Sequence, residues 1–255
     1  MSQHHRLHLD PGLLESAGEG ERLELPPEAA SYLVRVLRLG VGDTVEIFDG
    51  LGFVREAALV AVEGKRVYLQ PGERRAGLPL PPPFLLLQPV LKGEKMDWLI
   101  QKACELGLSA LWPVSTERCV VQLDPKKAEK RLERWRKIAE EACRQCGRAD
   151  LPELRPPSSL REALAALPPA ADLQRLVAWE EEEGRGLREA VRAAGGAPGH
   201  ALLVGPEGGL TAAEVEAAQE AGFEAVSLGG RILRAETAGL AVLAALRFEQ
   251  GELGR

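Results

Sequence analysis

The stretch HALLVGPEGGLTAAEVEAAQ, residues 200–219, decides the fold, because an apolar run ends in Gly-Pro-Glu-Gly-Gly and a helical pattern follows at once. The run is continuously apolar, as in a strand of a parallel sheet that is covered on both faces. Thr211 and Glu214 have the spacing of a capping box, which starts a helix. The stretch therefore predicts a strand, a tight loop and a helix. In parallel α/β sheets such loops bind ligands, since they lie at the carboxyl ends of strands.

The same alternation of strand and helix fills the chain after residue 83. Continuous apolar runs that precede helical patterns predict an α/β domain with a mostly parallel sheet. The expected strands lie in the ranges 84–90, 110–116, 173–180, 200–205 and 224–230, and the expected helices in 94–107, 124–147, 186–195, 211–222 and 235–250. The last helix is apolar around most of its circumference, which favours burial either within the monomer or against a second subunit.

Residues 1–72 show short alternating runs and tight turns instead, which predict a small β-barrel. One helix is expected among these strands, over residues 26–40, with a face formed by Tyr32, Leu33, Val36 and Leu37. The Pro-rich stretch 73–83 has the composition of a stiff linker. We therefore expect the α/β domain to cover residues 84–255.

The composition is that of a globular protein, with 45% apolar and 27% charged residues and a formal net charge of −6. No apolar run approaches the roughly 20 residues of a membrane helix, and the first residues lack the apolar segment of a signal peptide. We expect a cytoplasmic protein with no membrane partner. Cys143 and Cys146 have redox or zinc spacing, but they end a helical pattern and lack a second ligand pair, so we expect reduced, structural cysteines and no metal.

A basic segment interrupts this acidic chain. Between residues 126 and 148, nine Lys and Arg residues stand against four Glu residues, a local excess of five positive charges. Such a face either meets phosphates or belongs to a solvated helix laced with ion pairs four residues apart. The pattern alone favours neither interpretation.

A second glycine-bearing loop, LGGRILRAETA at residues 228–238, ends another expected strand. We expect the two loops at neighbouring strand ends, forming one pocket that binds a small cofactor through backbone groups. Gly205, Gly208 and Gly209 lack Cβ atoms, which allows a ligand to touch the main chain there. Neither loop contains a P-loop, a GxGxxG fingerprint or a GxSxG elbow, which argues against the corresponding nucleotide and hydrolase sites.

The loop sequences GPEGGLTAAE and SLGGRILRAETA resemble those of the ribosomal RNA small-subunit methyltransferase E family in the SPOUT superfamily. Three further stretches agree with that family in the expected order: YLVRVLRLGVGDTVEIFDG, KGEKMDWLIQKACELG with LWPVSTERC, and RWRKIAEEACRQCGR. The resemblance extends from about residue 32 to residue 238. Gly230 departs from the family pattern, since relatives often carry Pro there, and this concerns only the rigidity of the loop.

This resemblance implies a SPOUT methyltransferase domain with a trefoil knot, a PUA-like RNA-binding barrel at the N-terminus and a homodimer. It implies S-adenosyl-L-methionine as the methyl donor and N3 of a uridine in small-subunit (16S) ribosomal RNA as the acceptor. The exact nucleotide stays open, as does the choice between free RNA and the assembled small subunit as substrate. The family's cofactor role falls on Leu203, Gly205, Glu207, Gly208, Leu228, Gly229, Ile232, Leu233 and Thr237.

Methylation at N3 requires that the uracil lose its N3 proton and that the charge left on O2 and O4 be stabilised. We expect Arg234 to orient the uracil or to stabilise this charge. Glu207 and Glu236 are candidate proton acceptors, although either carboxylate could instead hold a loop amide or favour a helix start. For RNA binding we expect six basic residues on separate elements: Arg6, Arg35, Arg38, Lys92, Lys95 and Lys102.

Two other functions fit the same residues. A ribose 2′-O methyltransferase of the same superfamily would share the donor and differ in the acceptor atom. A non-catalytic RNA-binding adaptor would keep the barrel and the basic helix but would need no paired cofactor loops. Nucleoside analysis of the modified RNA distinguishes the first alternative, and a binding measurement with the donor distinguishes the second.

Overall fold

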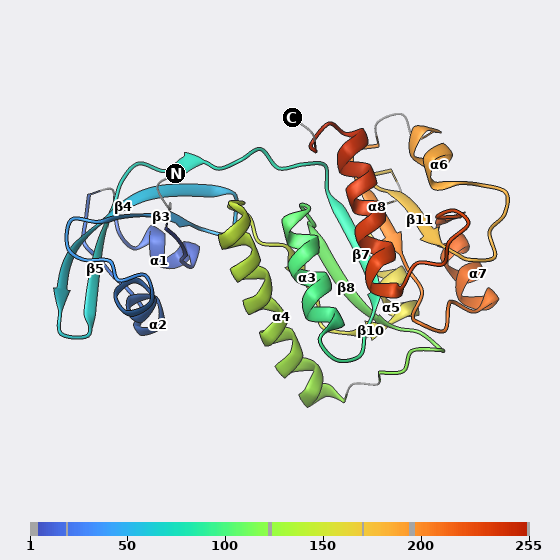
Figure 1. Cartoon of the computed structure of the whole chain (residues 1–255), viewed down its shortest axis with the longest axis horizontal. Coiled ribbons are helices and arrows are strands. Elements are labelled where there is room, and N and C mark those ends of the chain that lie inside the picture. Colours follow the sequence, from blue (N-terminus) through green and yellow to red (C-terminus); the bar gives the residue numbers. More distant parts are fainter. Residues whose placement is uncertain (1–4, 19, 122–123, 170, 194–196, 254–255) are drawn as a thin grey trace. The chain divides into compact units, whose positions relative to one another are not determined.

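The computed structural model describes residues 5–18, 20–121, 124–169, 171–193 and 197–253 (Figure 1). It divides into two compact units. The first unit consists of Met1–Leu80 together with Cys143–Leu151, and the second of Pro81–Ala142 together with Pro152–Arg255. The long helix α4 (Pro125–Cys146) therefore begins in the second unit and ends in the first. No pattern in the sequence predicts that residues 143–151 return to the N-terminal unit.

The sheet of the first unit runs in the order β1-β3-β4-β5-β2, with β6 beside β4. Its strands are β1 (Arg6–His8), β2 (Leu23–Glu24), β3 (Thr44–Phe48), β4 (Phe53–Glu63), β5 (Arg66–Pro71) and β6 (Arg75–Ala76). β4 and β5 pair as the antiparallel hairpin that the sequence predicts. β6 lies within the stretch expected to be a linker, so ordered pairing of this unit continues past residue 72.

The helical segment of the first unit differs in detail from the expected regular helix. After the short α1 (Pro11–Glu15), α2 (Pro27–Ser31) continues into a π-helical turn, η1 (Tyr32–Val36). The N–H of Leu37 donates to the carbonyl oxygen of Tyr32, five residues earlier, at 3.0 Å. This i→i+5 bond places more residues in one turn, so later side chains rotate away from the face that a 3.6-residue period predicts. Leu33 is accordingly buried, whereas Val36, expected on the same face, is 65% exposed.

The sheet of the second unit runs in the order β10-β8-β7-β12-β11-β13, with β9 beside β8. Its strands are β7 (Phe84–Pro89), β8 (Ala110–Ser115), β9 (Glu153–Leu154), β10 (Ser158–Ser159), β11 (Gln174–Ala178), β12 (His200–Leu203) and β13 (Glu224–Val226). Every pairing that joins these strands is parallel. The structure thus confirms the predicted α/β domain with its mostly parallel sheet.

Helices cover both faces of this sheet. They are α3 (Lys95–Glu105), the first part of α4, α5 (Leu160–Ala165), α6 (Leu187–Ala193), α7 (Ala212–Glu220) and α8 (Ala235–Glu249). Leu85 and Leu87 of β7 share a core cluster with side chains of α5 and α7. Leu86 faces the other way, toward Gly239 of α8, and α8 lies beside α3 (Figure 1). Burial on both faces explains why these strands are continuously apolar.

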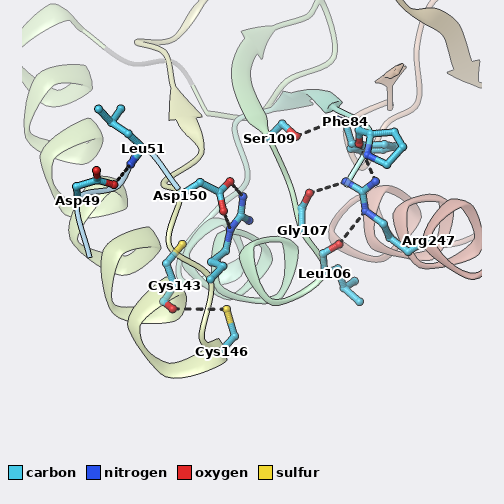
Figure 2. Close-up of polar contacts among 12 residues, drawn as sticks. Asp49, Leu51, Phe84, Leu106, Gly107, Ser109, Cys143, Cys146, Asp150 and Arg247 are labelled. Carbon is cyan, nitrogen blue, oxygen red and sulfur yellow. Dashed lines mark hydrogen bonds and ion pairs between the residues drawn. The ribbon is translucent and has the colours of Figure 1, made fainter. Parts of the chain in front are cut away.

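Buried Arg247 fixes α8 to the rest of the second unit. This side chain, which is 2% exposed, donates hydrogen bonds to the carbonyl oxygens of Leu106, Gly107 and Pro82 at 3.2, 2.6 and 2.7 Å (Figure 2). These three carbonyl groups supply the acceptors that a buried guanidinium requires. In the part of the chain that the structure describes, neither α8 nor any other helix has the length and hydropathy needed to cross a membrane.

Candidate functional site

A cavity of about 580 Å³ lies at the carboxyl ends of three strands in the second unit. Its walls come from residues that follow β11, β12 and β13. This edge of a parallel sheet is where α/β proteins place their ligands. The lining residues fall in three segments, 178–180, 204–209 and 227–235, with Ala238 beyond them.

The two glycine-bearing loops line this cavity together, but they do not follow neighbouring strands. β11 lies between β12 and β13, with Val177 opposite Leu203 on one side and Ala178 opposite Val226 on the other. The expectation of adjacent strand ends was therefore wrong. Residues at the carboxyl end of β11 therefore form a separate part of the cavity wall.

Most of the residues expected to bind a cofactor line the cavity. Those at its wall are Gly205, Glu207, Gly208, Leu228, Gly229, Ile232 and Leu233. Leu203 is fully buried in the core cluster beneath the sheet edge, so it supports the loop rather than facing the cavity. Thr237 is also absent from the lining, and its N–H donates to the carbonyl oxygen of Arg234 in the first turn of α8.

Ala178, Trp179 and Glu180 line the cavity, and our sequence analysis missed them. They are the last three residues of the strand expected at residues 173–180, and applying the carboxyl-end rule to that strand would have found them. The Trp179 indole N–H is buried, and within the described chain it has no hydrogen-bond partner. Glu180 brings a carboxylate to the cavity wall, beside Gly209 of the first loop.

The glycines of the first loop are required mainly by protein neighbours. A Cβ atom on Gly205 would lie 3.2 Å from the backbone nitrogen of Leu210, and one on Gly208 would lie 3.1 Å from Cβ of Arg118. Gly209 has a φ of +72°, which favours glycine, and a Cβ there would also clash with the carboxylate of Glu180. Gly229 differs, since at φ +104° it has nothing within 4 Å of that position. Open backbone for a ligand is therefore found in the second loop rather than the first.

Residues after β8 hold the first loop from outside. The Arg118 guanidinium donates to the carbonyl oxygen of Gly208 at 3.0 Å. The backbone N–H of Glu117 donates to a carboxylate oxygen of Glu214 at 2.7 Å. Glu214 also completes the predicted capping box with Thr211 at the start of α7. The helix that follows the loop and the loop itself are thus tied to the same segment.

Charged side chains surround the entrance to α8. Arg234 is the N-cap residue of this helix, is exposed, and lines the cavity. Glu236, in the first turn, is 8% exposed and forms an ion pair with Lys95 at 3.3 Å. Lys95 also contacts Glu207 at 3.2 Å. The structure therefore brings the three expected catalytic residues to one region, with Lys95 among them.

The other residues expected to bind RNA lie in different environments. Arg35, Arg38 and Lys92 are exposed. Lys102 donates to Glu105 on its own helix at 2.8 Å. None of these positions forms part of the cavity lining.

Arg6 was expected to bind RNA, but its side chain is only 8% exposed. It pairs with Glu46 at 2.7 Å and donates to the carbonyl oxygens of Cys143 and Arg148 at 3.1 Å each. Within the first unit, this guanidinium joins the N-terminal strand to the segment that returns from α4. The structure thus gives Arg6 a structural role instead.

Cys143 and Cys146 lie in this returning segment. The Cys146 thiol donates to the Cys143 carbonyl oxygen at 3.7 Å, a contact that orients the sulfur along the helix end (Figure 2). Burial raises the pKa of the Cys146 thiol, which makes the reactive thiolate scarcer. Among the described residues, no group of three His, Cys, Asp or Glu side chains is arranged to hold a metal ion.

The parallel α/β sheet with a cavity at its strand ends and the separate N-terminal β sheet belong to two domains that family models identify: an RNA methyltransferase domain that follows a PUA domain. Residues 79–247 match the family model described as RNA methyltransferase domain, and residues 25–72 match the one described as RNA methyltransferase PUA domain. The chain belongs to the ribosomal RNA small subunit methyltransferase E family. It is 35% identical to the member from Bacillus subtilis over 237 residues, which cover 91% of each chain.

Two solved structures are similar over nearly the whole chain. The ribosomal RNA small subunit methyltransferase E from Neisseria gonorrhoeae, bound to S-adenosyl methionine, has a TM-score of 0.84 at 33% identity and covers 97% of this chain and 98% of its own. A protein from Legionella pneumophila, in complex with the bound cofactor SAM, has a TM-score of 0.85 at 31% identity, with coverage of 97% and 98%.

Proposed function

We propose that this protein is an S-adenosyl-L-methionine-dependent methyltransferase that methylates N3 of a uridine in small-subunit (16S) ribosomal RNA. The observation that carries the proposal is the cavity bounded by the two glycine-bearing loops in a chain of this family. Relatives at 31% and 33% identity were solved with this donor bound. We also propose that the second unit contains the trefoil knot that the resemblance to this family implies.

The residues of the cavity fit such a donor. Its volume of about 580 Å³ lies within the usual range for small-molecule sites, roughly 300–1,000 Å³. Leu228, Ile232 and Leu233 supply apolar surface for an adenine ring, and the open backbone at Gly229 supplies polar main-chain groups. Carboxylates at Glu180 and Glu207 offer partners for hydroxyl, amino and sulfonium groups.

The donor supplies a methyl group on a positively charged sulfur. The chain must then hold the uracil edge against it and accommodate the N3 proton and the developing charge on O2 and O4. In this proposal Arg234 donates to a uracil oxygen, and its support is that Arg234 is an exposed residue at the cavity wall. Glu207 and Glu236 are still the candidates for the proton acceptor. Lys95 forms an ion pair with each of these carboxylates.

The RNA partner would be held outside the cavity. Arg35, Arg38 and Lys92 are exposed basic residues suited to phosphate contacts. On α4, the side chains of Trp135, Ala139 and Ala142 are buried along one face. The exposed basic side chains of the same helix include Lys126, Lys130, Arg136 and Lys137, so it too presents positive charge to solvent.

We further propose that the protein is a cytoplasmic homodimer. One face of α8 is buried within its own unit, but Ala241, Ala245 and Phe248 are exposed at a spacing of four and three residues. Phe248 is 67% exposed, which is costly for a large aromatic side chain without a partner surface. A second copy of the chain would cover this stripe.

A methyl-transfer assay tests the proposed reaction. Purified protein is incubated with labelled S-adenosyl-L-methionine and either free 16S ribosomal RNA or assembled small subunits, both lacking the modification. Nuclease digestion and mass analysis of the nucleosides then locate the methyl group. We expect 3-methyluridine. A 2′-O-methylated nucleoside would support the ribose methyltransferase instead, and absence of both label and donor binding would support the non-catalytic adaptor.

A further inference from the structure

Lys95 links the two parts of the proposed donor site. It is the first residue of α3, in the segment that follows the central strand β7. Its ammonium group lies 3.2 Å from Oε1 of Glu207, in the first glycine-bearing loop, and 3.3 Å from Oε2 of Glu236, in the first turn of α8. The contact with Glu207 has hydrogen-bond geometry, and the contact with Glu236 is an ion pair.

The position of this lysine is unfavourable for α3 itself. A positive charge in the first turn of a helix opposes the helix dipole, which favours acidic residues there. Both carboxylates offset this cost: the hydrogen bond to Glu207 first, and then the contact with Glu236, raise the pKa of Lys95, because the two anions favour its charged form. The lysine is thus explained by its partners on other elements rather than by its own helix.

Glu236 depends on this contact more than Glu207 does. Its side chain is 11% exposed, whereas that of Glu207 is 36% exposed. A carboxylate with so little access to water needs a charged or hydrogen-bonding partner. Removing the ammonium would leave two carboxylates without the cation that they share, and their repulsion would push the first loop away from the start of α8.

We propose that Lys95 is a positioning residue for the methyl donor, and not an RNA ligand. By bridging Glu207 and Glu236 it sets the distance between the 205–209 loop and the N-terminus of α8, on which Arg234 is the cap. It does so from outside the cavity, since it is not among the residues of the lining. The inference rests on the proposed function for the identity of the donor.

Donor affinity tests this role directly. Calorimetry with S-adenosyl-L-methionine is run on the full-length wild type, Lys95→Met and Lys95→Arg, with Lys102→Met as the control. Lys102 is a matched position, because it lies on the same helix, has the same 37% exposure and pairs with Glu105. We expect Lys95→Met to weaken donor binding roughly tenfold or more, Lys95→Arg to restore it to within about threefold, and Lys102→Met to leave it unchanged.

A double-variant cycle separates positioning from general loss of stability. If Lys95 acts through Glu236, which does not line the cavity, the Lys95→Met/Glu236→Gln protein should bind the donor about as well as Lys95→Met alone, because both changes break one interaction. Additive losses would overturn the inference, as would wild-type affinity in Lys95→Met. Glu236→Gln provides the same test if Lys95→Met does not fold, because it breaks the contact with Lys95 at a residue outside the cavity lining.

Turnover distinguishes this inference from the proposed function. Suppose that the wild type binds the donor and transfers methyl groups, and that Lys95→Met binds the donor equally well. This result would refute the positioning role of Lys95 but not the proposed function. If the wild type does not bind the donor, both the positioning role of Lys95 and the proposed function are refuted. We expect the KM for the donor to rise in Lys95→Met while the KM for RNA stays unchanged, whereas an RNA-binding lysine would give the reverse.

Discussion

Arg118 holds the carbonyl oxygen of Gly208 through a 3.0 Å hydrogen bond, although the two residues are 90 positions apart in the chain. The bond connects the segment after β8 to the loop after β12. In the sheet, β7 lies between these two strands, and α3, the helix that follows β7, begins with Lys95. The first glycine-bearing loop is therefore held from two sides, by Arg118 at its backbone and by Lys95 at Glu207. This arrangement suggests that a loop of flexible glycines keeps one geometry before a ligand arrives.

Replacement of Arg118 tests this preorganisation. Arg118→Met removes one hydrogen bond to a backbone carbonyl, worth roughly 0.5–1.5 kcal/mol, so we expect donor affinity to fall about three- to tenfold. Isothermal calorimetry measures the change. Arg161→Met is a suitable control, since Arg161 is exposed on α5 and lies outside the cavity. Equal affinities of the wild type and Arg118→Met would show that the loop needs no such brace.

Arg234 permits a prediction that separates binding from chemistry. In Arg234→Ala we expect donor affinity to stay within about twofold of the wild type, and kcat to fall roughly a hundredfold, because an electrostatic donor near developing charge contributes about that much. Single-turnover assays with saturating donor measure the effect. A parallel loss of affinity and rate would show that Arg234 binds the donor rather than the uracil.

The elements of this fold were predictable because each depends on local pattern. The capping box of Thr211 and Glu214 forms as expected, and on α4 the buried residues Trp135, Ala139 and Ala142 lie at the i, i+4, i+7 spacing of one helical face. The π-helical turn was not predictable, since nothing in a 3.6-residue period marks where an extra residue enters. Val36 is exposed for this reason.

The site was only partly predictable, because it depends on strand order. Periodicity locates β11, β12 and β13 but does not say that β11 lies between the other two, so the two glycine-bearing loops alone do not indicate that Glu180 lines their cavity. Charged side chains pose a related difficulty. Lys95 and Arg6 both look like surface charges in the sequence, yet their partners lie 112 and 137 residues away. Only the tertiary contacts show that one meets two carboxylates and the other is buried.

His200 makes the stability of the second unit depend on pH. Burial first, and then the positive charge of Arg247, lower the pKa of this β12 histidine to about 4, from an ordinary value of 6.5. The unfolded chain therefore binds a proton between these values that the folded chain does not. The folded chain therefore keeps its full stability above pH 6.5 and loses stability as the pH falls toward 4. At pH 5 this loss in the free energy of unfolding is about 2 kcal/mol.

Urea unfolding between pH 7.5 and 4.5 measures this dependence, with His200→Gln as the comparison. Because carboxylates titrate in both proteins, the difference between the two curves isolates the histidine. We expect the wild type to lose stability relative to His200→Gln as the pH falls below 6.5. Parallel curves would mean that His200 is protonated as readily in the folded chain as in the unfolded one.

Arg6 and Arg35 form a contrasting pair in the first unit. Arg6 is buried, pairs with Glu46 and donates to two carbonyl groups of the segment that returns from α4, whereas Arg35 is exposed. Arg6→Met would leave those carbonyls and Glu46 without their charged donor, so we expect a loss of roughly 2–3 kcal/mol in the free energy of unfolding. Arg35→Met should unfold like the wild type, because a solvated side chain contributes little to stability.

RNA affinity should change in the opposite order. Filter binding with 16S ribosomal RNA, under conditions where both variants are folded, should show a weaker complex for Arg35→Met and an unchanged one for Arg6→Met, since only an accessible guanidinium can reach a phosphate. Raising the salt concentration should narrow the difference between Arg35→Met and the wild type, as expected for a lost phosphate contact. An Arg6→Met protein of wild-type stability that bound RNA poorly would mean that Arg6 is released from Glu46 to meet the RNA, and the structural role assigned to it would then be wrong.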